Sequence, residues 1–108
     1  MELVIIESPY AGDVKRNEEY ARACMADCLR RGEAPYASHL LYTQPGVLDD
    51  TIPAERKLGM KAGFAWAAAA SKRVVYTDLG MSRGMQAGVT SGEKLGQTIE
   101  YRTLDGWG

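Results

Sequence analysis

The sequence lacks the features that would place it in a membrane, in a disulfide-stabilised scaffold or along a nucleic acid. No apolar run reaches the 18 residues that a transmembrane helix needs, so no membrane partner is expected. Thirteen basic residues are interspersed with 14 acidic ones, and the formal net charge of -1 disfavours binding to a DNA or RNA polymer. A small anionic ligand stays open, because one or two well-placed cations suffice to hold it.

Metal ligands and cysteines are also scarce. The chain has one histidine and two cysteines, and Cys24 and Cys28 fall four residues apart on one face of a predicted helix. A disulfide or metal site would need more ligands nearby, so we expect no metal and two buried thiols in a reducing compartment. Residues 1–7 are acidic and lead directly into a strand-like run, so no signal peptide is expected and a cytoplasmic protein is predicted.

What is present is an alternation of short apolar strands and amphipathic helices. Residues 1–108 carry neither a repeat nor a linker, and their number suits one compact domain. Strands are predicted over residues 3–6, 34–38, 73–77 and 98–102, and helices over residues 14–31, 51–70 and 84–95. We expect Thr51 to cap the second helix and Gly32 to end the first. This order predicts an α/β fold, a small Rossmann-like or flavodoxin-like sandwich with a parallel sheet of about four strands.

Polar residues follow the apolar strands where each one ends. In parallel sheets, ligands bind beyond the carboxyl ends of the strands. Those ends are predicted at Glu7-Ser8, Ser38-His39 and Thr77-Asp78. Residues 39–50 are long and irregular for so small a domain, and such loops are usually functional or mobile. The sequence therefore predicts a site at this edge of the sheet.

Two segments have the composition of an anion site. Residues 8–12 join the first strand to the first helix and hold the polar Ser8 and Tyr10 beside Gly12, although a plain tight turn explains them too. At the third helix, Ser82 offers a hydroxyl, Arg83 a charge and Gly84 a bare N–H. Ser82 also suits a helix N-cap, and the two roles are compatible, since a capped first turn still presents free N–H groups.

Other titratable residues are candidates for chemistry. His39 is either a hydrogen-bonded structural residue or part of a pocket with Tyr42, Asp49, Asp50 and Arg56. Glu7 and Asp78, at strand ends, are the best acid and base candidates, and each could instead cap a helix or pair with Arg83.

Glycines recur every four residues at positions 80, 84, 88, 92 and 96, and again at 59 and 63. A glycine inside a helix costs about 0.5–1 kcal/mol relative to alanine, so the repeated bare face predicts a close approach. Another helix, a partner subunit or the ligand could make that approach, and helix–helix packing is the plainest interpretation.

These motifs together resemble the nucleoside 2-deoxyribosyltransferase-like superfamily, which includes nucleoside 5′-monophosphate N-glycosidases. The chain looks most like short, uncharacterised phage and bacterial proteins of that type. The resemblance rests on Glu7-Ser8-Pro9-Tyr10-Ala11-Gly12, on Ser38-His39 and on Gly80-Met81-Ser82-Arg83-Gly84-Met85, and it spans nearly the whole chain.

The resemblance implies roles for particular positions. Ser82 and Gly84 match the phosphate-binding serine and glycine of the hydrolases, and no cofactor is implied. The catalytic glutamate, six residues after that serine, would fall at Gly88, and an aspartate of the preceding helix at Gly63. Glycine cannot replace a nucleophile, so the cleaving end of the site is expected to be lost while the phosphate end is kept. Relatives that build their sites across subunits further imply a homodimer or higher oligomer.

Three interpretations follow. The first is a non-cleaving binder of a phosphorylated nucleoside or signalling nucleotide, a sensor or sequestering protein that could serve phage anti-defence. The second is an N-glycoside hydrolase or deoxyribosyltransferase with a relocated carboxylate, for which Glu7, Asp78 and Glu93 are the candidates. The third is a protein interaction module. The expected ligand-binding residues are Ser8, Tyr10, Gly12, His39, Arg56, Ser82, Arg83 and Gly84.

Overall fold

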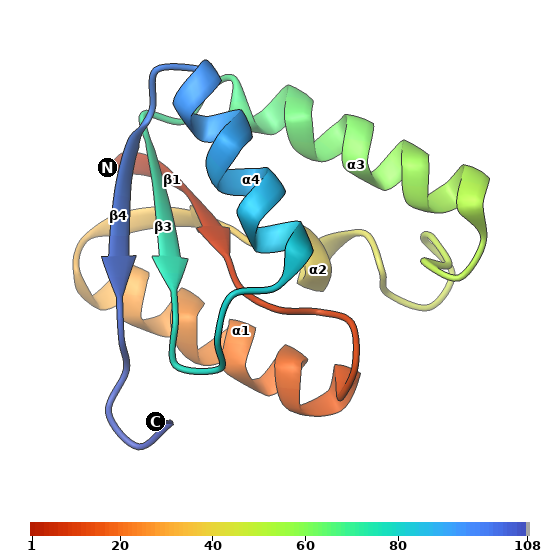
Figure 1. Cartoon of the computed structure of the whole chain (residues 1–108), viewed down its shortest axis with the longest axis horizontal. Coiled ribbons are helices and arrows are strands. Elements are labelled where there is room, and N and C mark those ends of the chain that lie inside the picture. The colour runs from red at the N-terminus through yellow and green to blue at the C-terminus, as the bar shows by residue number, and fades with distance from the viewer. Residues whose placement is uncertain (108) are drawn as a thin grey trace.

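The computed structural model describes residues 1–107 and contains four strands and four helices within that range (Figure 1). In chain order they are β1 (Glu2–Glu7), α1 (Val14–Arg30), β2 (Glu33–Tyr36), α2 (Ser38–Leu41), α3 (Pro53–Ala67), β3 (Lys72–Tyr76), α4 (Arg83–Lys94) and β4 (Thr98–Arg102). None of the helices described over residues 1–107 has the length and the apolar composition that spanning a lipid bilayer requires.

The strands form one parallel sheet in the order β2-β1-β3-β4. The crossover from β1 to β2 runs one way across the sheet, and the crossovers to β3 and β4 run the other way. Because such connections are right-handed, α1 covers one face and α3 and α4 lie on the opposite face. The α/β fold with a four-stranded parallel sheet is therefore confirmed.

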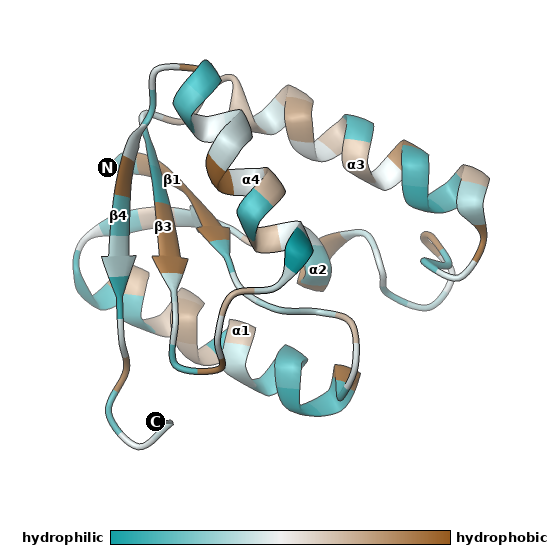
Figure 2. Cartoon of the chain, in the orientation of Figure 1, coloured by the Kyte–Doolittle hydropathy of each residue, from teal (hydrophilic) through white to brown (hydrophobic). Residues whose placement is uncertain are grey.

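The face under α1 holds most of the core. Apolar residues of β1 and β3 pack against one side of α1, and Figure 2 shows β1 as largely hydrophobic and β3 as hydrophobic towards its arrowhead. Tyr20, Cys24 and Cys28 recur every four residues on that side and are fully buried. Both cysteines are free, which confirms the buried thiols that their spacing predicts.

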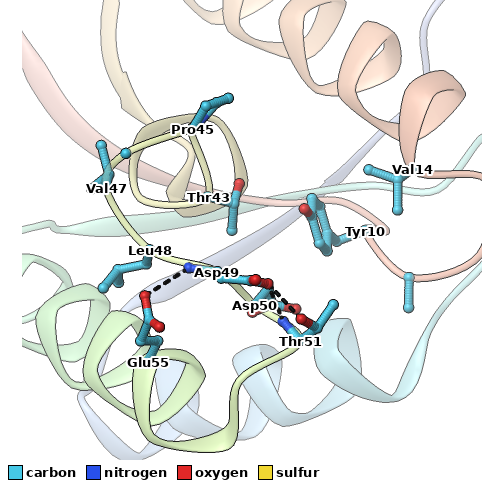
Figure 3. Close-up of a pocket in the computed structure, with 12 residues that line it drawn as sticks. Tyr10, Val14, Thr43, Pro45, Val47, Leu48, Asp49, Asp50, Thr51 and Glu55 are labelled. Atoms are coloured by element: carbon cyan, nitrogen blue, oxygen red, sulfur yellow. Dashed lines mark hydrogen bonds between the residues drawn. The ribbon is translucent and has the colours of Figure 1, made fainter.

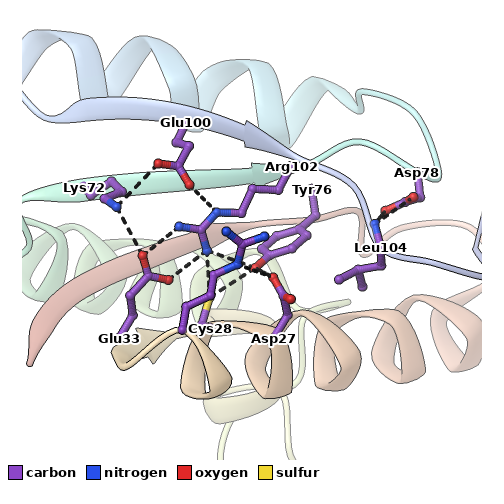
Figure 4. Close-up of polar contacts among 10 residues, drawn as sticks. Asp27, Cys28, Glu33, Lys72, Tyr76, Asp78, Glu100, Arg102 and Leu104 are labelled. Carbon is purple, nitrogen blue, oxygen red and sulfur yellow. Dashed lines mark hydrogen bonds and ion pairs between the residues drawn. The ribbon is translucent and has the colours of Figure 1, made fainter.

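A buried ion pair crosses the same face of the sheet. The Arg102 guanidinium on β4 donates to both Glu33 carboxylate oxygens on β2, at 2.8 and 2.7 Å, and also donates to the Tyr76 hydroxyl at 3.2 Å (Figure 4). Lys72 adds a second cation 3.1 Å from Glu33. The Arg102 hydrogen bonds and Lys72 lower the pKa of Glu33 to about 2, so this carboxylate is charged at neutral pH.

Several predicted boundaries are wrong at the ends of β2 and α3. The strand predicted to end at Ser38 ends at Tyr36, because Ala37 is the N-cap of α2. The short helix α2 also occupies the start of the segment that was predicted to be irregular. Thr51 does not cap α3: its N-cap is Ile52, since the Thr51 hydroxyl donates to Asp49 Oδ1 at 2.6 Å instead. That helix also ends at Ala67 and not near residue 70.

Candidate functional site

The loops after β1, β2 and β3 gather at the carboxyl edge of the sheet, as the parallel topology requires (Figure 1). The loop after β1 is held firmly. Ser8 is buried, and the Asn17 side-chain amide of α1 donates to the Tyr10 and Ala11 carbonyls at 2.9 and 3.1 Å. Gly12 lies at φ +99°, a left-handed conformation that glycine adopts without strain, and turns the loop into α1.

Tyr10 and His39 form an aromatic pair at this edge. Their ring centroids lie 4.8 Å apart with an interplanar angle of 19°, which is a stacked arrangement. Burial lowers the pKa of His39, against the opposing effects of Asp50 and of a hydrogen bond with the Ser8 backbone. His39 is therefore neutral at pH 7, and its ring packs against one face of the Tyr10 ring.

Tyr10 lines an open cleft of about 670 Å³ between the β1–α1 loop, the segment before α3 and the first turn of α3 (Figure 3). Its other lining residues are Ala11, Val14, Thr43, Pro45, Gly46, Val47, Leu48, Asp49, Asp50, Thr51 and Glu55. Glu55 Oε1 accepts from the Asp49 N–H at 3.0 Å, which ties the loop to α3. Three carboxylates on the wall favour a ligand that presents N–H or O–H donors and disfavour a phosphate inside this cleft.

The start of α4 lies at the same edge and is built as predicted. Ser82 is the N-cap, because its Oγ accepts from the Met85 N–H at 3.2 Å. Arg83 and Gly84 follow on the exposed surface, and their N–H groups at the start of a helix have no carbonyl partner within it, whereas the Met85 N–H is taken by Ser82. The structure places these three residues outside the lining of the cleft, and it places Arg56 on the exposed surface of α3, also outside that lining.

Glu7 ends β1 and faces α4. Its Oε2 accepts from Arg73 Nη1 at 2.9 Å, and the same nitrogen donates to the Gly88 carbonyl at 2.8 Å. Burial raises the pKa of Glu7 to about 7, although Arg73 opposes this effect. Glu7 is therefore a carboxyl group that changes charge near neutral pH.

The glycine face of α4 explains why this pair can form. A Cβ built on Gly88 would lie 2.3 Å from the Glu7 carboxyl carbon, and one on Gly92 would lie 2.9 Å from Ile99 Cδ1. The close approach predicted from the glycine spacing is thus present. The partner is the sheet, so the expectation of helix–helix packing is wrong at these two positions.

The other two candidate carboxylates are placed differently. Asp78 accepts from the Tyr20 hydroxyl at 2.6 Å and from the Leu104 N–H at 3.0 Å, so it joins α1 to the chain after β4. Glu93 is exposed near the end of α4, and that end lies at the opposite edge of the sheet from the strand carboxyl ends. Glu7 combines a strand-end position with a raised pKa.

Sequence reasoning missed Arg73. A lone arginine among the apolar residues of a predicted strand, Arg73-Val74-Val75, was the available signal, because a buried arginine needs a carboxylate or carbonyl partner. It is 3% exposed, and its Nη2 has no hydrogen-bond partner among the described residues. In residues 1–107, no group of three or more His, Cys, Asp or Glu side chains is placed to hold a metal ion.

Solved structures show the same fold in two enzymes. A 2-deoxyribosyltransferase from Bacillus psychrosaccharolyticus superposes with a TM-score of 0.72 at 11% identity, over 96% of this chain and 74% of the enzyme. A 2-desoxiribosyltransferase from Leishmania mexicana superposes with a TM-score of 0.66 at 11% identity, over 97% of this chain and 66% of the enzyme. No curated protein matches the sequence.

At 11% identity these likenesses show the fold alone, which is that of the 2-deoxyribosyltransferases. A family model, Domain of unknown function (DUF7768), matches residues 2–102, which is nearly the whole chain. The chain therefore belongs to the DUF7768 family.

Proposed function

We propose that this protein binds a phosphorylated nucleoside at the carboxyl edge of its sheet. The observation that carries the proposal is the open cleft of about 670 Å³ at that edge, with Tyr10 on its wall. Its volume falls in the range of small-molecule sites, and an aromatic ring beside carboxylates suits a nucleobase that stacks and donates hydrogen bonds. The fold is shared with enzymes that are described as 2-deoxyribosyltransferases, one of them a biocatalyst for nucleoside synthesis.

The acidic wall of the cleft and the start of α4 suit different parts of such a ligand. The base and sugar present N–H and O–H donors that Asp49, Asp50 and Glu55 can accept. The phosphate suits the exposed first turn of α4, where Arg83 supplies a charge and the helix N-terminus supplies free N–H groups. Ser82 caps that turn, and Gly84 adds no side chain to it.

Two forms of this function differ in the fate of the glycosidic bond. In the first, glycines at 63 and 88 leave the ligand intact, and the protein is a sensor or sequesters a signalling nucleotide, which would suit phage anti-defence. In the second, the protein is an N-glycoside hydrolase or deoxyribosyltransferase. The observation that favours the second form is the Glu7 carboxyl group, which lies directly against Gly88.

The proposal includes a homodimer or higher oligomer. Two sides of α3 carry exposed large apolar residues. Met60 and Phe64, four residues apart, are 53% and 52% exposed on one side, and Leu58 and Trp66, eight residues apart, are 57% and 55% exposed on another. Monomeric proteins rarely leave so many large apolar side chains uncovered on one helix, and packing of α3 between copies of the chain would cover them.

Mass spectrometry of the purified and denatured protein tests whether a nucleotide is retained. Calorimetry then compares dAMP, dGMP, dCMP and dTMP with the corresponding nucleosides. We expect Arg83→Ala to weaken binding of the monophosphates about 10-fold or more and to leave nucleoside binding unchanged, because a charge-assisted hydrogen bond contributes about 1.5–3 kcal/mol. Arg22→Ala, which changes another exposed arginine, on α1, is the matched control. Equal binding of nucleosides and monophosphates, or no binding of either, contradicts the proposal.

A further inference from the structure

The contact between Glu7 and Arg73 is poorly suited to stabilising the folded protein. Arg73 is 3% exposed. Its Nε donates a hydrogen bond to Gln97 Oε1 at 3.1 Å, and its Nη1 donates to Glu7 Oε2 and to the Gly88 carbonyl. Its Nη2 stays buried without a partner in the described part of the chain, which costs about 1–3 kcal/mol. A buried ion pair that leaves a donor unpaired is weak evidence for a stabilising role.

The pair also leaves one carboxylate oxygen free. Oε2 of Glu7 accepts from Arg73, whereas Oε1 makes no hydrogen bond to residues 1–107 and is not among the fully buried unpaired atoms. The Glu7 side chain retains 14% of its surface exposed. Arg73 therefore fixes the position of the Glu7 carboxyl group through Oε2, and Oε1 remains accessible at the carboxyl edge of the sheet.

Gly88 shows what the carboxyl group replaces. A Cβ on Gly88 would lie 2.3 Å from Glu7 Cδ and 2.3 and 2.4 Å from its two oxygens, so Glu7 occupies the space into which a side chain at 88 would extend. Position 88 is also where the family resemblance places a catalytic glutamate. A carboxyl group is thus present directly beside position 88, supplied by the neighbouring strand.

We infer that Glu7 is the catalytic carboxylate of the site, transposed from α4 to the end of β1, and that it cleaves the N-glycosidic bond of the bound nucleoside phosphate. This inference rests on the proposed function, because it requires the nucleotide to lie at this edge. Gly88 is then the compensating change, since any larger residue would displace the Glu7 carboxylate.

The chemistry needs only water as a co-reactant. Ionised Glu7 Oε1 adds to C1′ of the sugar while the C1′–N bond breaks, and the electron pair of that bond leaves with the base. The base takes a proton from solvent water. A water molecule then adds to C1′ and releases the carboxylate, and its proton replaces the one that the base took. The products are the free base and the sugar phosphate.

The first test measures base release by chromatography from dAMP, dGMP, dCMP and dTMP, with binding measured by calorimetry on the same samples. Glu7→Gln keeps an acceptor for Arg73 and is expected to bind as the wild type does while its turnover falls about 1,000-fold or more, as when a nucleophile is removed. Glu2→Gln is the matched control, because it changes an exposed glutamate at the opposite end of the same strand, β1, and should leave turnover unchanged.

A reciprocal exchange makes the test sharper. Gly88→Glu alone is expected to be inactive, because its side chain and Glu7 compete for one space. The double variant Glu7→Ala with Gly88→Glu returns the carboxylate to α4 and should recover at least part of the turnover. Recovery in the double variant would not be expected if Glu7 were only structural.

The pH profile provides a readout that does not depend on any variant folding. The charged group in contact with Glu7 is Arg73 on β3, and α4 contributes the Gly88 backbone. The nucleophile must be ionised, so kcat/KM of the wild type should rise with pH through a midpoint near 7.

The outcomes separate the inference from the proposed function. Binding of a monophosphate without base release overturns the inference and leaves the proposed function standing. Base release that is unchanged in folded Glu7→Gln, or that shows no midpoint near pH 7, also overturns it. Absence of both binding and release overturns both.

Discussion

Helices α1 and α3 lie on opposite faces of one sheet and are of similar length, 17 and 15 residues, yet they are packed very differently. α1 buries Tyr20, Cys24 and Cys28 completely, whereas Ala67 is the buried residue of α3. Leu3, which points to the α3 side because Val4 faces α1, is 47% exposed. The side chains under α1 are thus packed as a complete core, whereas α3 leaves several large apolar side chains exposed.

The largest expected effect comes from truncating one aromatic residue on each helix. Tyr20→Ala should lower the free energy of unfolding by about 3–5 kcal/mol, because it leaves a cavity in the core and removes the hydroxyl that bonds Asp78. Phe64→Ala should cost less than about 1 kcal/mol in a monomer, since half of that side chain is already exposed. Urea denaturation at low protein concentration measures both. Equal losses would show that α3 is as much a part of the core as α1.

The two faces should also respond to pH in opposite directions. The pKa of Glu33 is lowered to about 2, so its stabilising contribution is present above its ordinary pKa of 4.5 and is lost as pH falls towards 2. The pKa of Glu7 is raised to about 7, so the folded protein holds a proton that the unfolded chain has released. Stability should therefore fall by about 1–3 kcal/mol between pH 4.5 and 7.

Glu7→Gln isolates the second effect. The variant should lose the decline in stability between pH 4.5 and 7 and keep the decline below pH 4.5, as measured by denaturant unfolding across the pH range. A variant that retains the full decline above pH 4.5 would assign it to another group.

Self-association tests the exposed helix directly. We expect the wild type to sediment as a dimer or larger species and the double change Phe64→Ser with Trp66→Ser to sediment as a monomer, because both side chains are about half exposed on α3. Leu29→Ser, an exposed apolar residue on α1, is the control and should leave the assembly unchanged. A wild-type monomer at high concentration would contradict the proposal.

The smallest effects come from single methyl groups. No atom lies within 4 Å of a Cβ added at Gly63 on α3, so Gly63→Ala should stabilise an isolated monomer by about 0.5–1 kcal/mol. Gly88→Ala should instead destabilise the protein, since the added Cβ meets the Glu7 carboxyl group at 2.3 Å. Thermal unfolding of the two variants gives the comparison, and a stabilising Gly88→Ala would mean that Glu7 is free to move away.

Much of the fold could be predicted because it depends on local patterns. The apolar run of β1 and the four-residue spacing of Tyr20, Cys24 and Cys28 indicate one buried strand and one amphipathic helix without reference to distant residues. Ser82 as an N-cap is equally local, since it bonds Met85 three residues later. The predicted boundaries near Tyr36 and Ile52 were wrong because Ser38 also suits the start of a helix, and because the Thr51 hydroxyl bonds Asp49 in the preceding loop.

The sequence by itself thus determined the order of strands and helices, the parallel sheet and the edge at which its polar loops meet. The tertiary structure decided which side chains share a space there. Glu7 meets Arg73 66 residues further along the chain, and Glu33 meets Arg102 69 residues away. Such meetings depend on strand register and on the distance between α4 and the sheet, and no local periodicity encodes them. Gly88 is the clearest case, because its spacing predicts a close approach and only the packed sheet shows that a carboxylate makes it.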